Sequence, residues 1–122
     1  MSKTVLVVDD DTVVAEISKR KLEGCGFEVQ TAGSGIEAMQ SMKSRIPDVI
    51  LLDVQMPDMN GYTFILEKAK IAECADVPVV VLTAYMEMEP LFKRYSVIKA
   101  YLLKPLKLQE LIDKVVEIIG QP

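Results

Sequence analysis

The feature that most constrains the fold is a set of short runs in which almost every residue is apolar. Val49–Leu52 shows no alternation of polar and apolar residues, and Thr4–Val8 and Pro78–Thr83 have nearly the same character. An alternating strand keeps one face in water, whereas a strand without alternation is buried on both faces, as in the parallel sheets of α/β proteins. These runs therefore predict the central strands of a parallel sheet that is covered on both sides.

Helical patterns separate the strand-like runs, and helix-capping and helix-breaking residues bound several of them. The expected strands are Thr4–Val8, Phe27–Thr31, Asp48–Asp53, Pro78–Thr83 and Lys99–Leu103. The expected helices are Thr12–Gly24, the segment from Ser34 to Pro47, Tyr62–Cys74, a weaker one at Glu87–Tyr95 and the segment from Leu108 to Ile119. Strands that alternate with helices predict an α/β fold with right-handed crossovers. We expect a flavodoxin-like, doubly wound (βα)5 domain with a five-stranded parallel sheet in the order 2-1-3-4-5.

Composition excludes several classes of protein. The 122 residues suit a single domain, 1–122, and 50% of them are hydrophobic, which argues against disorder. A net charge of −4 argues against a nucleic-acid partner, and no apolar run approaches the ~20 residues that cross a bilayer. Together with the absence of a leader-like start, this predicts a cytoplasmic protein. The two cysteines, Cys25 and Cys74, are expected to be reduced, and the chain has no histidine.

Polar residues lie at the carboxyl ends of four of the five expected strands. Asp9 and Asp10 directly follow the first strand, Asp53 ends the third, Thr83 ends the fourth and Lys104 directly follows the fifth. In the order 2-1-3-4-5 these four strands are neighbours, so their carboxyl ends place the five side chains in one pocket. Three carboxylates this close repel one another unless a cation joins them. Mg²⁺, a hard ion that prefers oxygen ligands, suits such a site.

These residues are the chemical groups that phosphoryl transfer onto a carboxylate requires. Asp53 is the expected nucleophile, which gives an aspartyl phosphate. The metal ion, Lys104 and Thr83 are expected to hold the oxygens of the phosphoryl group as charge develops on them.

Four motifs in this order resemble the receiver domain of two-component response regulators, which is CheY-like in fold. They are Val7–Asp10, Leu52–Gly61, Val81–Ala84 and Lys104–Pro105. The resemblance covers essentially the whole chain. It implies a phosphoprotein of phosphorelay signal transduction that catalyses only its own phosphorylation and dephosphorylation and is otherwise not an enzyme.

The resemblance also implies a role for each matching residue. Asp53 resembles the phospho-acceptor, Asp9 and Asp10 the acidic pair that binds Mg²⁺, and Gln55 the residue whose backbone carbonyl completes the metal site. Thr83 and Lys104 match the switch hydroxyl and the phosphate-binding lysine, and Tyr101 matches the switch aromatic residue. The Lys104–Pro105 bond is similar to one that is cis in the family, although the sequence alone favours trans.

We therefore expect a response regulator without an output domain that acts through protein–protein contacts as a monomer or weak dimer. The expected partners are a sensor histidine kinase or phosphotransfer protein and a downstream protein, with neither nucleic acid nor membrane. Because the chain lacks histidine, the phosphoryl donor must be another chain or a small molecule such as acetyl phosphate.

Three alternatives remain at this point. Asp9 and Asp11 have the spacing of a metal-dependent phosphohydrolase that forms an aspartyl phosphate, which leaves Asp53 unexplained. A flavin protein of the same fold needs a phosphate-binding loop where this chain has three acids. A pseudo-receiver acts by contact alone. For Asp11 the simpler interpretation is helix N-capping.

Overall fold

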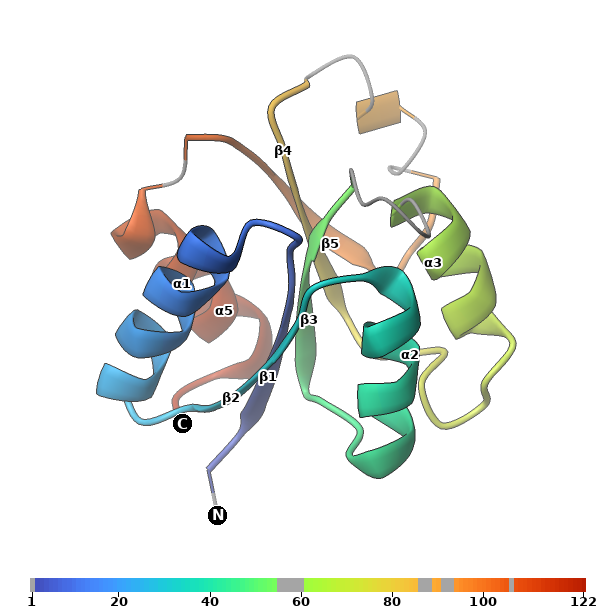
Figure 1. The fold of residues 1–122 in the computed structure, drawn as a ribbon, viewed down its shortest axis with the longest axis horizontal. Coiled ribbons are helices and arrows are strands. Elements are labelled where there is room, and N and C mark those ends of the chain that lie inside the picture. Colours follow the sequence, from blue (N-terminus) through green and yellow to red (C-terminus); the bar gives the residue numbers. More distant parts are fainter. Residues whose placement is uncertain (1, 55–60, 86–88, 91–93, 106) are drawn as a thin grey trace.

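Five parallel strands form the centre of the protein in the computed structural model, which describes residues 2–54, 61–85, 89–90, 94–105 and 107–122 (Figure 1). The strands are β1 (Thr4–Val8), β2 (Glu28–Ala32), β3 (Val49–Asp53), β4 (Val79–Thr83) and β5 (Ile98–Leu103). The helices are α1 (Thr12–Gly24), α2 (Gly35–Ser44), α3 (Gly61–Ala69) and α5 (Leu108–Ile119). The strand order β2-β1-β3-β4-β5 confirms the predicted doubly wound topology. The helix expected at Glu87–Tyr95 lies largely outside the described residues.

Helices cover both faces of the sheet, with α1 and α5 on one side and α2 and α3 on the other (Figure 1). Every residue of β1, β3 and β4 is buried, as the runs without alternation predicted. Side chains of one strand point alternately to the two faces. In β3, Ile50 and Leu52 belong to the core on the α2–α3 side, and Val49 and Leu51 to the core on the α1–α5 side. The sheet therefore separates two hydrophobic cores.

Side-chain caps fix where α1 and α2 begin. The Asp11 carboxylate accepts hydrogen bonds from the backbone N–H groups of Val13 and Val14, at 3.0 and 3.2 Å. The Ser34 hydroxyl accepts one from the N–H of Glu37 at 3.1 Å. These bonds satisfy N–H groups that have no partner within the helix. The cap at Asp11 confirms the simpler interpretation of that residue.

Helix α3 ends at Ala69, earlier than the predicted end at Cys74. Beyond it the backbone continues in tight turns, with hydrogen bonds from Ile71 N to Lys68 O, Cys74 N to Ile71 O and Val77 N to Cys74 O. This spacing of three residues repeats the apolar periodicity of a helix, which is why the sequence pattern overshot. No helix among the described residues is long and apolar enough to span a membrane.

Gly61 joins α3 to the end of β3 at very short range. Its N–H donates to the Val54 carbonyl at 2.9 Å, and a Cβ placed on Gly61 lies only 2.7 Å from the Val54 Cα. The neighbouring atom belongs to the backbone, so a side-chain rotation cannot relieve the contact. Only glycine therefore allows the first turn of α3 to approach the strand that carries Asp53.

We predict that Gly61→Ala lowers the free energy of unfolding by about 1–3 kcal/mol, because the added methyl group overlaps the Val54 backbone. Urea unfolding followed by circular dichroism measures this change. Gly24→Ala is the matched control, since a Cβ at Gly24 has no atom within 4 Å apart from its chain neighbours and the backbone of its own helix. Equal stability of Gly61→Ala and wild type contradicts the prediction.

Lys68 is a buried lysine on α3, outside the acidic pocket. Only 1% of the residue is exposed, and its ammonium group donates to the Ala75 carbonyl at 2.9 Å. Burial lowers the pKa of Lys68, while Cys74 and Asp76 partly oppose that shift. The hydrogen bond also holds the turns after α3 against the helix.

A lowered pKa has a definite effect on stability. Between the folded pKa of Lys68 and its ordinary value of 10.5, the unfolded chain binds more protons, so stability contributed by this group rises with pH. We predict that wild type gains stability relative to Lys68→Met as the pH rises toward 10.5, measured by urea unfolding at several pH values. Lys70→Met, which removes an exposed lysine just after the helix, controls for loss of charge. A difference independent of pH contradicts the prediction.

Candidate functional site

An acidic cluster lies at the carboxyl edge of the sheet, where β1 and β3 end. Asp9, Asp10 and Asp53 each offer a carboxylate oxygen, and these oxygens lie within 4.8 Å of one another. Asp9 and Asp53 are only 1% and 5% exposed, whereas Asp10 faces solvent. The parallel register causes this convergence, since Val8 pairs with Leu52 and the acids follow directly. The structure thus brings together the three acids singled out from the sequence.

Lys104, which follows β5, reaches the same cluster. Its Nζ lies 3.1 Å from Oδ2 of Asp9 and 3.7 Å from Oδ2 of Asp53. Burial by itself disfavours the ammonium form of Lys104, but the hydrogen bond to Asp9 and the charges of Asp53, Asp9 and Asp10 outweigh it. The pKa of Lys104 is therefore raised. At neutral pH this lysine is a fixed positive charge between two buried carboxylates.

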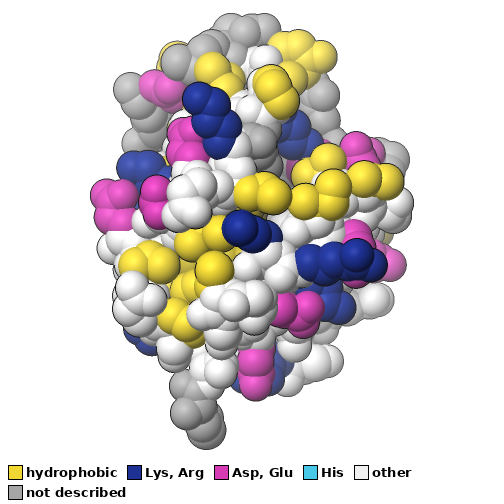
Figure 2. Space-filling model, turned by 90° about the vertical axis from the view of Figure 1, so that its left-hand side faces the viewer, with side chains coloured by type: hydrophobic (Ala, Val, Ile, Leu, Met, Phe, Trp, Pro, Cys, Tyr) yellow, Lys and Arg dark blue, Asp and Glu magenta, His cyan; other side chains and the backbone are white. Residues whose placement is uncertain are grey.

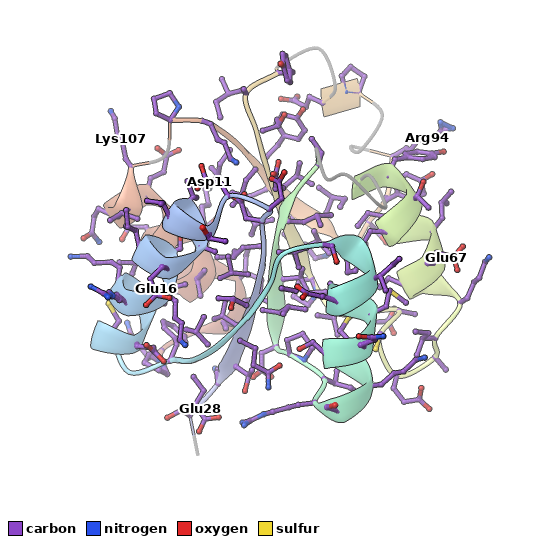
Figure 3. The ribbon with its side chains drawn as sticks, in the orientation of Figure 1. Asp11, Glu16, Glu28, Glu67, Arg94 and Lys107 are labelled. Atoms are coloured by element: carbon purple, nitrogen blue, oxygen red, sulfur yellow. The ribbon has the colours of Figure 1, made fainter. Side chains whose placement is uncertain are left out.

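A backbone group orients Asp9 within the cluster. The N–H of Asp11 donates to Oδ1 of Asp9 at 2.9 Å, so the two oxygens of Asp9 face Asp11 and Lys104 respectively. Asp11 itself lies at the start of α1, where its own carboxylate caps the helix (Figure 3). It does not belong to the cluster of acids found among the described residues. The sequence carries no signal for the Asp11–Asp9 bond, because any residue except proline supplies the same N–H.

Thr83 and Tyr101 meet through the backbone of Tyr85. Thr83 is buried at the end of β4, one residue beyond the pairing partner of Asp53, and its hydroxyl oxygen accepts from the Tyr85 N–H at 3.1 Å. The Tyr101 hydroxyl donates to the Tyr85 carbonyl at 2.7 Å. One peptide segment thus contacts both residues expected to act as a switch. Sequence reasoning missed this link, since it rests on backbone atoms.

Three further expectations concern Gln55, the Lys104–Pro105 peptide bond and the two cysteines. Gln55 lies outside the described residues. The Lys104–Pro105 peptide bond is cis, as the family resemblance implied and the sequence alone did not. Both cysteines are free, with Cys25 exposed and Cys74 buried.

The donor set fits a hard divalent cation. Three carboxylates and one ammonium group leave the pocket with two negative charges, and two of the acids are nearly inaccessible to solvent. Buried like charges repel unless a cation joins them. Mg²⁺ prefers oxygen ligands and is bound by a few carboxylates together with water and phosphate oxygens. Asp9, Asp10 and Asp53 are the described residues that could hold such an ion.

An apolar groove borders the pocket on the side of α1. It holds about 280 Å³. It is lined by Val14, Ile17, Ser18, Lys104, Pro105 and Leu108. Figure 2, which views this side of the molecule, shows hydrophobic side chains gathered between charged ones. Lys104 is the residue shared by the groove and the acidic cluster, since it lines the groove and its Nζ lies 3.7 Å from Oδ2 of Asp53.

Comparison with known proteins identifies the family that has this fold and site. The sequence profile of the response regulator receiver domain matches residues 5–116, and the chain belongs to that family. The transcriptional regulatory protein PrrA of Mycobacterium tuberculosis is 41% identical over 118 residues, which cover 93% of this chain and 48% of PrrA. The chain thus spans about half the length of this curated relative.

Two solved structures extend the comparison. The receiver domain of sensor histidine kinase PA1611 from Pseudomonas aeruginosa, which has a magnesium ion coordinated in its active site cleft, is 27% identical with a TM-score of 0.87. The match covers 99% of this chain and 100% of that one. Response regulator TrrA from Thermotoga maritima, solved with Mg²⁺ and a beryllium fluoride, is 31% identical with a TM-score of 0.83, covering 95% and 98%. The chain is therefore a CheY-like receiver domain homologous to two-component response regulators.

We predict that Asp9→Asn lowers the pKa of Lys104, because it removes the negative charge of the carboxylate that is hydrogen-bonded to Lys104 and leaves the burial that opposes the ammonium form. NMR titration of the Lys104 side chain measures this pKa. Asp11→Asn is the control, since asparagine caps a helix as well as aspartate and Asp11 does not contribute to the Lys104 pKa.

The raised pKa of Lys104 in the wild-type protein also affects the stability of the fold. A raised pKa means that Lys104 contributes stability fully at pH values below 10.5, and that this contribution is lost as the pH rises through the folded pKa. An unchanged Lys104 titration in Asp9→Asn contradicts the assigned cause.

Proposed function

We propose that Asp53 accepts a phosphoryl group and that the resulting aspartyl phosphate is the signal of this receiver domain. The observation that carries the proposal is the placement of Asp53, a nearly buried carboxylate with Lys104 Nζ at 3.7 Å and with Asp9 and Asp10 in the same cluster. Membership of the response regulator receiver family supports it.

The chemistry follows from this arrangement. A carboxylate oxygen of Asp53 attacks phosphorus and forms an O–P bond, while the bond between phosphorus and the donor breaks and the donor leaves with the electron pair. Lys104 neutralises charge that develops on the phosphoryl oxygens, and the Thr83 hydroxyl donates to one of them. Positioning and charge stabilisation of this kind supply most of the catalysis in phosphoryl transfer. Hydrolysis by water later returns Asp53 to a carboxylate.

Mg²⁺ is the cofactor that we propose for this step. Asp9, Asp10 and Asp53 would hold it, together with the backbone carbonyl expected at Gln55. When bound, it draws negative charge from the phosphoryl oxygens. The PA1611 receiver domain, with magnesium in its active site cleft, supports this assignment.

The donor histidine lies outside these 122 residues, which contain no histidine. We infer that a sensor histidine kinase or a phosphotransfer protein supplies the phosphoryl group and that acetyl phosphate can replace it. Apart from its own phosphorylation and dephosphorylation, the domain catalyses no reaction. We further propose that Thr83 and Tyr101, joined through Tyr85, reorient after phosphorylation and change contacts with a downstream protein.

The phosphohydrolase alternative is not favoured by the site. It requires Asp9 and Asp11 to act together on the substrate, yet the Asp11 carboxylate accepts hydrogen bonds from the first turn of α1. Asp53, which that alternative leaves without a role, lies in the acidic cluster instead.

Incubation with acetyl phosphate tests the proposal. We predict that wild type gains the mass of one phosphoryl group when Mg²⁺ is present and that removal of Mg²⁺ with a chelator abolishes the gain. Intact-protein mass spectrometry measures it. Asp53→Asn is expected to show no gain, because the amide is not a nucleophile of this kind.

Asp48→Asn is the matched control for that variant. Asp48 immediately precedes the same strand at its other end, where its carboxylate accepts from the Thr4 N–H at 2.7 Å. We expect it to be phosphorylated like wild type. Phosphorylation of Asp53→Asn to the wild-type extent rejects the proposed function. A folded wild type that gains no mass indicates a pseudo-receiver that acts by contact alone or a receiver that accepts phosphate only from its own kinase.

A further inference from the structure

Two tyrosines form a side-chain contact outside the acidic pocket. The Tyr95 hydroxyl donates to the Tyr62 hydroxyl at 3.0 Å, and the two rings lie edge to face with their centroids 6.0 Å apart. The guanidinium group of Arg94 lies over the Tyr95 ring at 5.9 Å, beside the first turn of α3 (Figure 3). The hydrogen bond, together with burial, raises the pKa of Tyr95, so this hydroxyl stays protonated at neutral pH. We call the Tyr62–Tyr95 hydrogen bond the tyrosine latch.

One end of the tyrosine latch is held close to Asp53. Tyr62 follows Gly61, whose N–H donates to the carbonyl of Val54, the residue after Asp53. The approach of Gly61 to Val54 leaves no space even for a methyl group. Packed backbone does not compress, so a displacement of Val54 moves the first turn of α3 and Tyr62 with it.

The other end of the latch is held at the start of β5. The Tyr95 carbonyl accepts from the N–H of Ile98, the first residue of that strand, at 3.0 Å. Strand β5 carries Tyr101 and leads into Lys104, whose ammonium group contacts Asp53. The latch therefore joins the chain that leaves Asp53 to the chain that enters the strand before Lys104, across 33 residues of sequence.

We propose that the tyrosine latch stabilises the arrangement in which Asp53 is unmodified and is weakened when Asp53 carries a phosphoryl group. The proposal rests on the proposed function, since it takes Asp53 as the modified residue. A phosphoryl group adds three oxygens to a carboxylate that is only 5% exposed and directly precedes the buried Val54, so we infer that Val54 shifts to admit them. A hydrogen bond of 3.0 Å between two half-buried side chains weakens steeply with such a displacement. Tyr62 and Tyr95 are therefore positioning residues that act through the Val54–Gly61 junction.

Thermodynamic reciprocity gives the proposal a measurable sign. If modification of Asp53 weakens the latch, then loss of the latch must favour modification by the same factor. A net contribution typical of one hydrogen bond corresponds to about a fivefold change in affinity. Tyr62→Phe and Tyr95→Phe each remove only one oxygen atom and keep the rings in contact.

The experiment titrates the protein with beryllofluoride and Mg²⁺, a combination seen in the TrrA structure, and measures the bound fraction by fluorine NMR. Tyr62→Phe and Tyr95→Phe are each expected to bind beryllofluoride about fivefold more tightly than wild type. The double variant is expected to bind no more tightly than either single variant, because both substitutions remove the same bond.

Ser41→Ala is the matched control. It removes another hydrogen bond between partly buried side chains, Ser41 to Gln30 at 3.0 Å, which joins α2 to β2. We expect this variant to lose stability without a change in beryllofluoride affinity, which separates coupling from a general loss of stability.

The possible outcomes are distinct. Wild-type affinity in both single variants overturns the proposal and shows that the pair is only structural. Additive effects in the double variant also overturn it, because the two tyrosines then act separately. Failure of wild type to bind beryllofluoride counts against the proposed function itself and removes the basis of the latch. If one single variant does not fold, the other carries the test.

Discussion

One ammonium group, that of Lys104, lies between two nearly buried carboxylates, and the arrangement of the pocket depends on it. Asp9 and Asp53 repel each other in a region of low dielectric constant, and Lys104 offsets part of that repulsion at 3.1 and 3.7 Å. The contact requires the ends of β1, β3 and β5 to meet at one edge, which the order β2-β1-β3-β4-β5 provides. The sheet topology thus brings these charged side chains together. Burying charges costs free energy, and the two hydrophobic cores on the faces of the sheet contribute the stability that offsets this cost.

The sequence predicted those parts of the fold and site that depend on side-chain type. Runs such as Val49–Leu52 predicted strands buried on both faces, because only the sheet interior accepts apolar residues without alternation. Asp9, Asp53 and Lys104 were predicted to meet because parallel strands bring their carboxyl ends to one edge. Each of these predictions follows from chemistry that a residue carries with it.

The parts that the sequence did not predict depend on backbone atoms or on distant pairings. Asp9 is oriented by the N–H of Asp11, and Thr83 contacts the N–H of Tyr85, groups that most residues share. The end of α3 was misplaced because successive tight turns repeat the apolar spacing of a helix. The Tyr62–Tyr95 contact crosses 33 residues and has no local pattern.

Two lysines show why burial alone does not define a site. Lys68 is almost fully buried and donates to a neutral carbonyl, so loss of hydration dominates and its pKa is lowered. Lys104 also loses hydration, but the charges of three aspartates outweigh that loss and its pKa is raised. Three acids exceed what one lysine can neutralise, so the pocket keeps an attraction for further positive charge that the surroundings of Lys68 lack. This remaining negative charge distinguishes the surroundings of Lys104, which fit a cation, from those of Lys68, where the lysine donates to a neutral carbonyl.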